Sequence, residues 1–444
     1  MEKPTIYISV EIKSREYVSQ ILLAAHAVQS GYRVYIGSHA AIYALLSMKK
    51  KKAGIYLDKS VQPKVRMDWN RSHVDSYCVM DAELTPYYSA EFWESEFPSR
   101  IFPGTDELVD KFLVVGPEIA EVANRHYGDG NSKVIMTGWP RIDVWQGLGH
   151  LIFADEVQRI QKRYGDYLLF ASSFGNIRDP LETQTTSVVP PNDTKTTKIT
   201  AQLKNFRNFK KTIEIIRNWD NNVNFPTLII RPHPSERVQI WQKELGPMKK
   251  TYVIQEESTT PWVLASSGVI HHRSSVAIEA YYSDKNVFAL ELGEKNPSEE
   301  VGLNVSKFLL DEKTCKSGFK LWNAAINYDF NPKILLNSII SGNQNSTSRI
   351  LEVFKSLTVT TEPSHNRNRV LLSQINMRSI RRAAGLIRDE YYWKVGKINM
   401  NSQMHFIPGG LDKKHIQMVM KIDKDFRNVR YRRMTLNLWE LDMQ

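Results

Sequence analysis

Short apolar runs alternate with longer amphipathic stretches through the first third of the chain. Residues 5–37 begin with the apolar run "TIYISV", continue through a polar loop and a stretch with apolar residues at helical spacing, and end, after Gly31, in "RVYIG". This order predicts a strand, a helix and a second strand. Four further runs end in glycine or polar residues: "GIYLDKS", "VDSYCVMDAE", "KFLVVG" and "KVIMTG". Strands at this spacing, with helical segments between them, predict a parallel, doubly wound sheet.

The same alternation starts again at "DYLLFASSFG". Strand and helix patterns follow in "FRNFKKTIEIIRNWD", "PTLIIRPHP", "TYVIQ", "TPWVLASSG", "VIHH", "SSVAIEAYYS" and "NVFALEL". A Thr- and Pro-rich stretch, residues 176–200, precedes them and is predicted to be a loop and a candidate lid. The sequence therefore predicts an α/β fold in which two Rossmann-like, doubly wound parallel-sheet domains face each other across a cleft.

Composition shifts along the chain suggest where the domains begin and end. The first Rossmann-like domain is predicted at residues 1–148, because Gly and Pro punctuate "TGWPRIDVWQGLG", and the second at residues 165–341. Residues 342–368 are rich in Asn, Ser, Thr and Arg, which predicts a linker. Residues 369–444 are expected to form a basic, helical extension that includes "MRSIRRAAGLIRDEYYWKV".

Composition and charge narrow the class of protein. The chain has 444 residues, of which 42% are hydrophobic and 24% charged, as in a folded globular protein. Its two cysteines, Cys78 and Cys315, have no His or Cys at metal-ligand spacing. No stretch has the length and flanks of a signal peptide or membrane span, so we expect a cytoplasmic protein. The formal charge of +11 forms no single basic stripe, which argues against nucleic acid and favours anionic small molecules or an anionic membrane surface.

Polar residues that follow the apolar runs are candidates for ligand binding, because open parallel sheets bind ligands beyond the carboxyl ends of their strands. In the first half these are Glu11, Lys59, Asp81, Glu83 and the segment from Gly138 to Asp143. In the second half they are Ser172, Ser173, Arg231, His233 and the segment from His271 to Ser275.

The segment "VIHHRSSVAIEAYY" has the pattern of an anion site. A strand is predicted to end at His271 or His272, and Ser274 or Ser275 falls where a helix N-cap belongs. Helix amides and Arg273 would then hold a phosphate or carboxylate. Glu279 lacks capping-box spacing from either serine and could accept a hydrogen bond from a ligand hydroxyl. The alternative is that the serines only cap the helix.

Asp81 and Glu83 lie two residues apart at a predicted strand end in "YCVMDAELTPYY". Paired carboxylates suit a general base, a nucleophile or a metal site, and a solvated strand end is the alternative. Neither G-x-G-x-x-G after the first strand nor a P-loop motif occurs, which disfavours dinucleotide oxidoreductases and P-loop NTPases. The absence of G-x-S-x-G leaves an esterase with little support.

Two prolines hold His233 in "IIRPHPSE", where Pro232 and Pro234 fix the backbone on either side. Together with "SVEIKSRE", "GIYLDKS", "VMDAEL", "TGWPRID" and "HHRSSVAIEA", this segment resembles the bacterial surface-carbohydrate biosynthesis protein family. More distantly, the set is similar to glycosyltransferases of the GT-B fold that carry a His-Pro motif, such as Kdo transferases, sialyltransferases and CDP-glycerol-dependent teichoic-acid polymerases. The resemblance covers about residues 4–310.

The resemblance implies roles for particular residues. It assigns His233 and Pro234 to the phosphate of a cytidine nucleotide, and Ser274 and Ser275 to the same phosphate or to a sugar carboxylate. It assigns the catalytic carboxylate to Asp81 or Glu83, although Leu84 stands where many relatives have glycine. The full candidate set comprises the catalytic residues Asp81, Glu83 and His233; the donor-nucleotide residues Arg231, His233, Pro234, Ser172, Ser173, His272, Arg273, Ser274, Ser275 and Glu279; and the acceptor or cleft residues Glu11, Arg15, Lys59 and Arg141.

The implied reaction is glycosyl transfer from a nucleotide-activated sugar, with CMP-Kdo or a related CMP-linked sugar acid favoured as donor. The implied acceptor is a surface polysaccharide or lipid-linked glycan, reached by peripheral contact with the inner face of an anionic cytoplasmic membrane. Because helix amides and cations would stabilise the leaving phosphate, neither a metal nor another cofactor is expected. The alternatives are a CDP-glycerol or UDP-sugar transferase of the same fold, a non-catalytic scaffold, and a hydrolase or epimerase.

Overall fold

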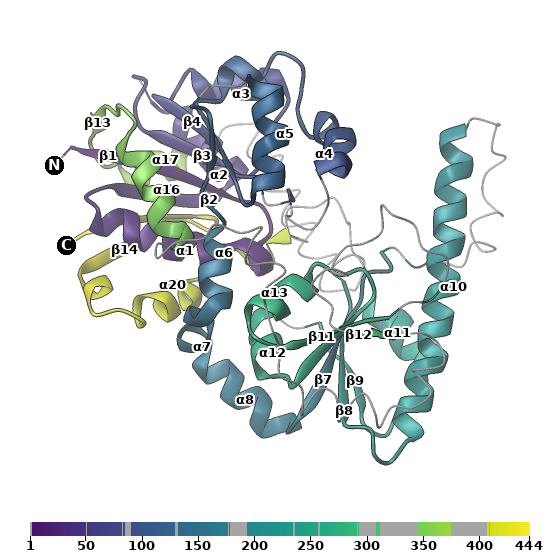
Figure 1. Ribbon diagram of the computed structural model, residues 1–444. Helices are drawn as coiled ribbons and strands as arrows, with labels where there is room; N and C mark the ends of the chain where they lie inside the picture. Colours follow the sequence, from purple (N-terminus) through teal and green to yellow (C-terminus); the bar gives the residue numbers. More distant parts are fainter. Residues whose placement is uncertain are drawn as a thin grey trace. The chain divides into compact units, whose positions relative to one another are not determined.

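The chain folds into two compact units, which Figure 1 shows for the computed structural model. The first unit combines Met1–Ile152 with Lys333–Gln444, and the second comprises Phe153–Pro332. The structure describes residues 2–49, 51–81, 83–84, 90–128, 132–175, 177, 193–233, 236–255, 258–290, 292, 308–310, 345–373, 406–407 and 409–444.

The first unit is built on a sheet whose parallel part has the order β2-β1-β3-β4-β5-β6. Its strands are β1 (Lys3–Val10), β2 (Arg33–Ser38), β3 (Ile55–Asp58), β4 (Ser76–Val79), β5 (Lys111–Val114) and β6 (Val134–Met136). The chain first adds β2 on one side of β1 and then adds β3 to β6 on the other side. The strand order therefore reverses between β1 and β3, the point at which such sheets bind ligands.

Helices connect these strands, as the sequence pattern predicts. They are α1 (Lys13–Gln29), α2 (His39–Leu46), α3 (Lys64–Arg71), α4 (Ala90–Glu96), α5 (Pro117–Tyr127), α6 (Pro140–Asp143) and α7 (Gly149–Ile152), with short helical turns at Phe97–Arg100, Asp106–Leu108 and Val144–Leu148. In α1, Tyr17, Ile21, Ala24 and Val28 recur at helical spacing and are fully buried. Burial of this apolar stripe fixes α1 against the sheet, and the helix begins just beyond the end of β1.

The segment after residue 344 differs from the predicted linker and extension. It contains α16 (Ser346–Lys355), β13 (Thr361–Glu362), α17 (Arg367–Ser373), α20 (Lys413–Met420), a turn at Asp425–Asn428, β14 (Val429–Thr435) and β15 (Leu438–Met443). β13 pairs with β1, β15 pairs antiparallel with β2, and β14 pairs with β15, so the described sheet has nine strands. The expected linker therefore carries a helix and a strand, and residues 409–444 complete the first unit. The basic helix expected at residues 377–395 lies outside the described residues.

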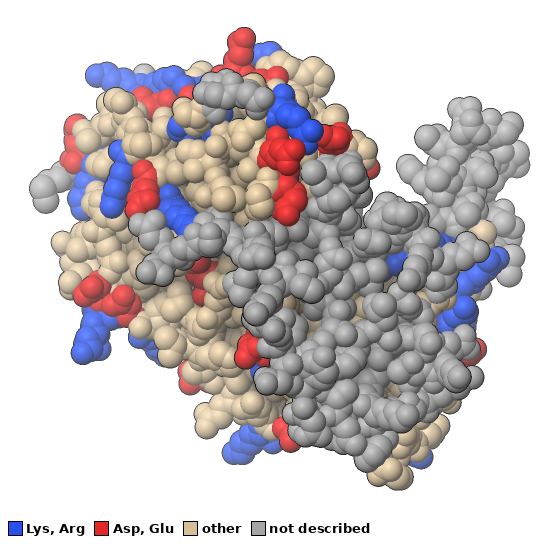
Figure 2. Space-filling view, viewed as in Figure 1, with Lys and Arg blue, Asp and Glu red and all other residues tan. Residues whose placement is uncertain are grey.

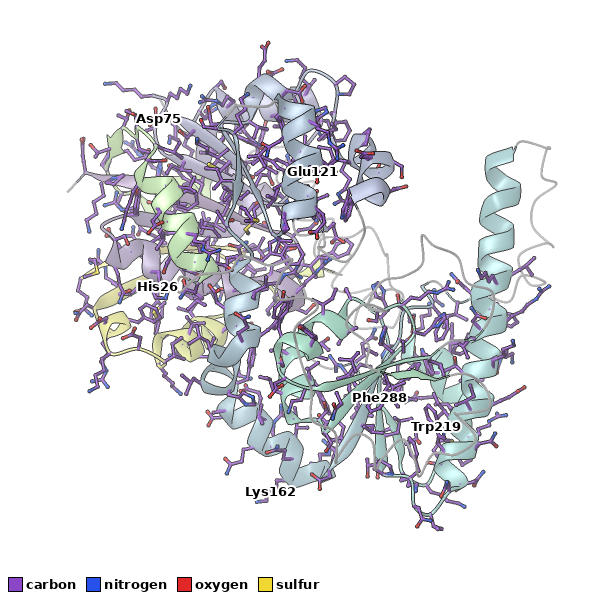
Figure 3. The ribbon with its side chains drawn as sticks, viewed as in Figure 1. His26, Asp75, Glu121, Lys162, Trp219 and Phe288 are labelled. Carbon is purple, nitrogen blue, oxygen red and sulfur yellow. The ribbon has the colours of Figure 1, made fainter. Side chains whose placement is uncertain are left out.

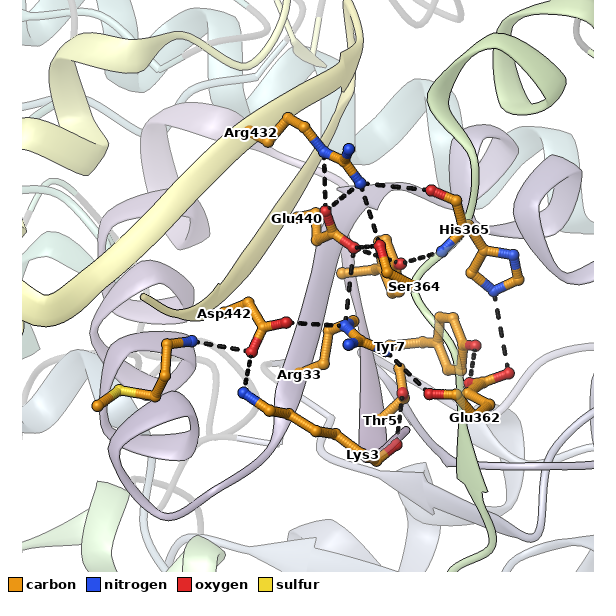
Figure 4. Close-up of polar contacts among 12 residues, drawn as sticks. Lys3, Thr5, Tyr7, Arg33, Glu362, Ser364, His365, Arg432, Glu440 and Asp442 are labelled. Atoms are coloured by element: carbon orange, nitrogen blue, oxygen red, sulfur yellow. Dashed lines mark hydrogen bonds and ion pairs between the residues drawn. The ribbon is translucent and has the colours of Figure 1, made fainter. Parts of the chain in front are cut away.

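Strands β14 and β15 contain many charged side chains and therefore lack the apolar pattern that predicts a strand. In "VRYRRMT" three arginines interrupt the apolar positions, and Glu440 and Asp442 are buried within β15. Figure 4 shows where these carboxylates go: Asp442 accepts hydrogen bonds from Arg33 Nε at 3.0 Å and Lys3 Nζ at 2.5 Å. Glu440 binds Tyr35 at 2.7 Å and Arg432 Nη2 at 2.6 Å. Strand β15 is thus tied to β1 and β2 by ion pairs, of which Arg33–Asp442 is buried on both sides.

The second unit has its own parallel sheet, with the order β12-β11-β10-β7-β8-β9 in its described part. Its strands are β7 (Tyr167–Ala171), β8 (Thr227–Arg231), β9 (Thr251–Val253), β10 (Gly268–His271), β11 (Asn286–Leu290) and β12 (Phe308–Leu310). Relative to their order along the chain, this is the 3-2-1-4-5-6 order of dinucleotide-binding sheets, with its reversal between β7 and β10. The predicted α/β class, with two Rossmann-like parallel sheets as in the GT-B fold, is confirmed.

The helices of the second unit are α8 (Ala154–Tyr164), α10 (Asp193–Asn221), α11 (Val238–Leu245), α12 (Thr260–Ala265) and α13 (Val276–Tyr282). Helix α10 begins at Asp193, so the last eight residues of the predicted 176–200 loop are helical, and of the rest only Ile177 is described. Trp219 on α10 and Phe288 on β11, both labelled in Figure 3, belong to one buried apolar cluster. None of the described helices is long and apolar enough to cross a membrane.

Candidate functional site

Two groups of polar residues lie at the carboxyl ends of strands, one in each unit, and each adjoins the reversal of its sheet. We call them the first-sheet cluster (Glu11, Arg15, Lys59, Glu83 and Arg141) and the second-sheet cluster (Ser172, Ser173, His233, Arg273, Ser274 and Ser275). All of these residues were singled out by the sequence. The sheet register explains why each group converges.

In the first-sheet cluster, two ion pairs bridge neighbouring strand ends. Glu11 follows β1 and binds Lys59, which follows β3. Arg15, in the first turn of α1, binds Glu83, which follows β4. Since β1, β3 and β4 are adjacent strands, both pairs lie at one edge of the sheet. Their side chains are between 14% and 38% exposed, so a ligand can reach them.

One member of each pair has a pKa that favours its charged form. Burial raises the pKa of Glu83, but Arg15 and Lys59 outweigh it and the pKa lies below its ordinary value. Burial lowers the pKa of Lys59, but the hydrogen bond and the charge of Glu11 outweigh it and the pKa is raised. At neutral pH the cluster therefore presents fixed charges of both signs.

Arg141 and Glu16 lie close enough to affect these charges. Arg141, in α6, is buried, with its guanidinium carbon 4.6 Å from the ring centre of Trp139 and 5.3 Å from that of Trp145. Its charge contributes to the lowered pKa of Glu83 and partly offsets the effect of burial on the pKa of Glu16. Glu16 accepts the amide of Glu11 at 3.1 Å, and burial raises its pKa. Glu16 did not stand out in the sequence, because it sits inside an apolar helix pattern.

Asp81 and Glu83 have different surroundings, although the sequence could not separate them. Asp81 is buried, and both of its oxygens accept from Arg100, Oδ2 from Nε and Oδ1 from Nη2, each at 2.9 Å. Oδ1 also accepts the amide of Glu83 at 2.9 Å. Asp81 therefore holds the loop, whereas Glu83 faces the cluster. No signal in the sequence pointed to Arg100, which lies in a short helical turn.

The second-sheet cluster follows three adjacent strands. Ala171 of β7 is paired with both Arg231 of β8 and His271 of β10, so the residues after these strands meet at one level. Ser172 is buried, Ser173 is half-buried and His233 is exposed. Pro234 lies outside the described residues. Arg231 is buried, with its guanidinium carbon 5.4 Å from the ring centre of Trp262.

The two loops beside β7 and β8 are tied together by Glu236. This buried carboxylate accepts from the Ser172 hydroxyl, the Phe174 amide at 2.6 Å, the Gly175 amide at 3.2 Å and Trp241 Nε1 at 2.9 Å. Burial raises its pKa, and the donors around it act in the opposite direction. Glu236 fixes residues 172–175 next to the cluster. The acid that ends "RPHPSE" was the available sequence signal for it.

We expect Glu236→Gln to lower the free energy of unfolding by about 2 kcal/mol, because in either orientation the glutamine NH₂ faces an N–H donor. One carboxylate oxygen accepts from Phe174 and Gly175, and the other from Trp241. Urea unfolding measures the loss. The matched control is Glu214→Gln on the exposed side of α10, which should be nearly neutral. Equal stability of the two variants would contradict this role.

The start of α13 brings a strained backbone to the cluster. Arg273 has φ of +53°, a left-handed conformation that costs energy in residues other than glycine. Ser274 is buried; its hydroxyl accepts the amide of Val276 at 3.3 Å and its own amide donates to His271 Nδ1 at 3.3 Å. Ser275 is the exposed N-cap residue, and its side chain makes no capping bond. Of the two serines predicted to cap the helix, Ser274 is therefore the one whose hydroxyl accepts an amide at the start of α13.

The two histidines before Arg273 support this loop. His271 is fully buried, and burial, with a smaller contribution from His272, lowers its pKa to about 3. His272 lies with Nδ1 3.0 Å from the Leu290 carbonyl, and its ring stacks on Phe174 at 5.0 Å. Glu279 is buried one turn into α13. His271 is thus a neutral, buried residue that supports the loop. Among the described residues, no group of three or more side chains is arranged to hold a metal ion.

Comparisons with known proteins extend the fold assignment. No protein-family profile and no curated protein matches the chain. Two solved structures match with TM-scores of 0.51: the UDP-GlcNAc 2-epimerase from Methanocaldococcus jannaschii, at 13% identity over 80% of this chain and 99% of that one, and a putative UDP-N-acetylglucosamine 2-epimerase from Listeria monocytogenes, at 11% identity over 80% and 97%. The wall teichoic acid polymerase TagF matches more distantly, with a TM-score of 0.40, 10% identity and coverage of 80% and 88%. At these identities the likeness establishes the fold alone.

Proposed function

We propose that the chain is a nucleotide-sugar-dependent glycosyltransferase of surface glycan assembly. The observation that carries the proposal is the second-sheet cluster, which gathers hydroxyls, a half-buried arginine and an exposed histidine at the strand reversal of a dinucleotide-type sheet. Such positions bind nucleotide phosphates. Two structures of similar fold carry UDP-GlcNAc in their names, which supports a nucleotide-sugar as the co-substrate.

In the proposed reaction the second unit holds the leaving group. The bond between the anomeric carbon and the phosphate oxygen breaks, and the nucleotide phosphate leaves with the electron pair. Ser274, Ser275 and Arg273 stabilise the negative charge that develops, and His233 contacts the same phosphate. The donor is a CMP-linked sugar acid, as the sequence resemblance implies, or a UDP- or CDP-linked group. With a protein-based clamp on the phosphate, turnover is expected to persist in EDTA.

The first-sheet cluster binds the acceptor, a glycan or lipid-linked glycan. Its fixed charges of both signs suit hydroxyl-rich ligands, which donate to Glu11 and Glu83 and accept from Arg15 and Lys59. Of the two predicted catalytic carboxylates, Glu83 is better placed to contact the acceptor, because Asp81 is engaged by Arg100. On the face shown in Figure 2 the coloured basic and acidic side chains are interspersed, so peripheral membrane contact rests on the overall charge.

An epimerase that interconverts nucleotide-sugars is the second candidate, because the Methanocaldococcus jannaschii and Listeria monocytogenes structures reported above both carry that name. A panel of UDP-, CDP- and CMP-linked donors, each with and without glycan acceptors, distinguishes the two. Acceptor-dependent release of one free nucleotide supports the transferase. Conversion of the donor sugar without an acceptor identifies the epimerase. Donors left unchanged, together with normal glycan synthesis in cells that carry His233→Ala, would indicate a non-catalytic scaffold.

A further inference from the structure

A buried carboxylate lies at the strand reversal of the first sheet, beneath the first-sheet cluster. Asp58, the last residue of β3, is fully buried. It accepts hydrogen bonds from the Tyr77 hydroxyl at 2.6 Å, the Lys59 amide at 2.8 Å and the Ser9 hydroxyl at 3.2 Å. These three donors fix the carboxylate at the point where β1 and β3 end.

A histidine faces this carboxylate. His39 Nδ1 lies 3.6 Å from Asp58 Oδ1 and 3.4 Å from the Tyr56 hydroxyl. No described residue forms a hydrogen bond with the other ring nitrogen, Nε2, and the side chain is 17% exposed. Asp58 and Tyr56 therefore face the ring through Nδ1. In the tautomer with the proton on Nδ1, toward the carboxylate, Nε2 keeps its lone pair for a ligand.

The local sequence explains the position of His39. Strand β2 ends at Ser38, whose hydroxyl accepts the Ala41 amide at 3.3 Å and so caps α2, and His39 is the first residue of that helix. At Gly37 a Cβ would lie 2.7 Å from the Asn437 carbonyl oxygen. Because the β14–β15 turn packs this closely against β2, the strand end is held in place. The order β2-β1-β3 then brings His39 across the end of β1 to Asp58.

The surroundings of His39 favour the neutral ring, mainly through burial. Burial lowers its pKa; Asp58 and Glu11 raise it, and Arg66 and Lys59 lower it, with the net effect below the ordinary value. The positive end of α2 also disfavours an imidazolium. A neutral imidazole backed by a carboxylate can accept a proton at neutral pH and stabilise the cation that results.

We propose that His39 is the general base of the glycosyl transfer, with Asp58 as its positioning residue. The inference rests on the proposed function and names the residue that takes the proton from the acceptor. His39 Nε2 takes the proton of the acceptor hydroxyl as that oxygen bonds to the anomeric carbon, and the bond to the phosphate oxygen breaks. The proton then passes to water when product leaves. Glu83 is a weaker base, because Arg15 and Lys59 hold its pKa low.

The test compares His39→Gln with His126→Gln. His126 belongs to the last turn of α5 and pairs with Asp106 on the surface, so its loss should change nothing. We expect His39→Gln to lower kcat by about a hundredfold or more and to leave nucleotide affinity within about twofold. The acid limb of the kcat profile, on which activity falls as the His39 ring becomes protonated, should disappear in this variant. A kcat within about threefold of the wild type would overturn the assignment.

A titration separates this inference from the proposed function. In NMR spectra of the full chain, the His39 ring should titrate below the ordinary range, and Asp58→Asn should shift its pKa lower still because it removes a favourable negative charge. If the pKa of the His39 ring is ordinary and does not change in Asp58→Asn, the two residues do not interact, whatever the enzymatic activity. If the wild type releases no nucleotide from any donor, the proposed transferase function is wrong, and so is the role of His39 as its general base. The titration still decides separately whether His39 and Asp58 interact.

Discussion

Replacing Arg33 with methionine is expected to lower the free energy of unfolding by about 3–5 kcal/mol, because removing one partner of a buried ion pair leaves the other charge uncompensated. Arg33 is buried at the start of β2; Nε lies 3.0 Å from Asp442 and Nη1 donates to the Glu362 carbonyl at 2.9 Å. Methionine keeps much of the volume but leaves Asp442 only Lys3 and the Met443 amide as donors among the described residues, both at Oδ1. The carboxylate then stays in a site where water cannot replace the lost donor.

Urea unfolding measures the effect, and Arg125→Met is the control. Arg125 pairs with Glu94 and Glu121, but its side chain is 47% exposed, so its loss should cost less than about 1 kcal/mol. The double variant Arg33→Met/Asp442→Leu should recover part of the stability, since both charges are then removed. A single variant as stable as the control would show that the C-terminal strands do not depend on this network.

Arg273→Gly is expected to weaken nucleotide binding by about a hundredfold, roughly 2.7 kcal/mol, with no loss of protein stability. The left-handed backbone at φ +53° costs energy with a side chain present and little with glycine. A strained arginine beside a strand reversal is expected where its guanidinium serves a ligand. Calorimetric titration with UDP, CDP and CMP measures affinity, and thermal unfolding measures stability.

Asp284→Gly provides a matched control. Asp284 is the other described residue, apart from glycines, with positive φ, at +56°, and it lies in the turn between α13 and β11 at the opposite edge of the sheet. This variant should gain a few tenths of a kcal/mol or more and keep its nucleotide affinity. Equal affinity in Arg273→Gly and Asp284→Gly would remove Arg273 from the phosphate site.

The sequence predicted both parallel sheets because their strands are buried on both faces and read as apolar runs, such as "YLLFA" and "TLIIR". It also predicted which polar residues would converge, because residues that follow parallel strands share one edge. Glu11 with Lys59 and Arg15 with Glu83 are examples. The pairing itself depends on strand order, which a single sequence does not specify.

Other features escaped prediction for physical reasons. Strands β14 and β15 bury Glu440 and Asp442, so charge interrupts the alternation that marks a strand. Helix α16 is capped locally by Asn345, but its start is also held by Asp143, about two hundred residues earlier in the chain, which accepts the Ser346 amide at 2.8 Å. His39 and Asp58 are unremarkable in sequence, since a lone histidine after a strand carries no motif. Only the sheet order brings them together.

The binding site of the nucleotide tests the central claim most directly. A crystal structure of the chain soaked with UDP, CDP or CMP should show the phosphate within hydrogen-bond distance of the residues that follow β7 and β10, at Ser172–Ser173 and Arg273–Ser275. Binding of none of the three nucleotides, or density for the phosphate away from that strand reversal, would contradict the account.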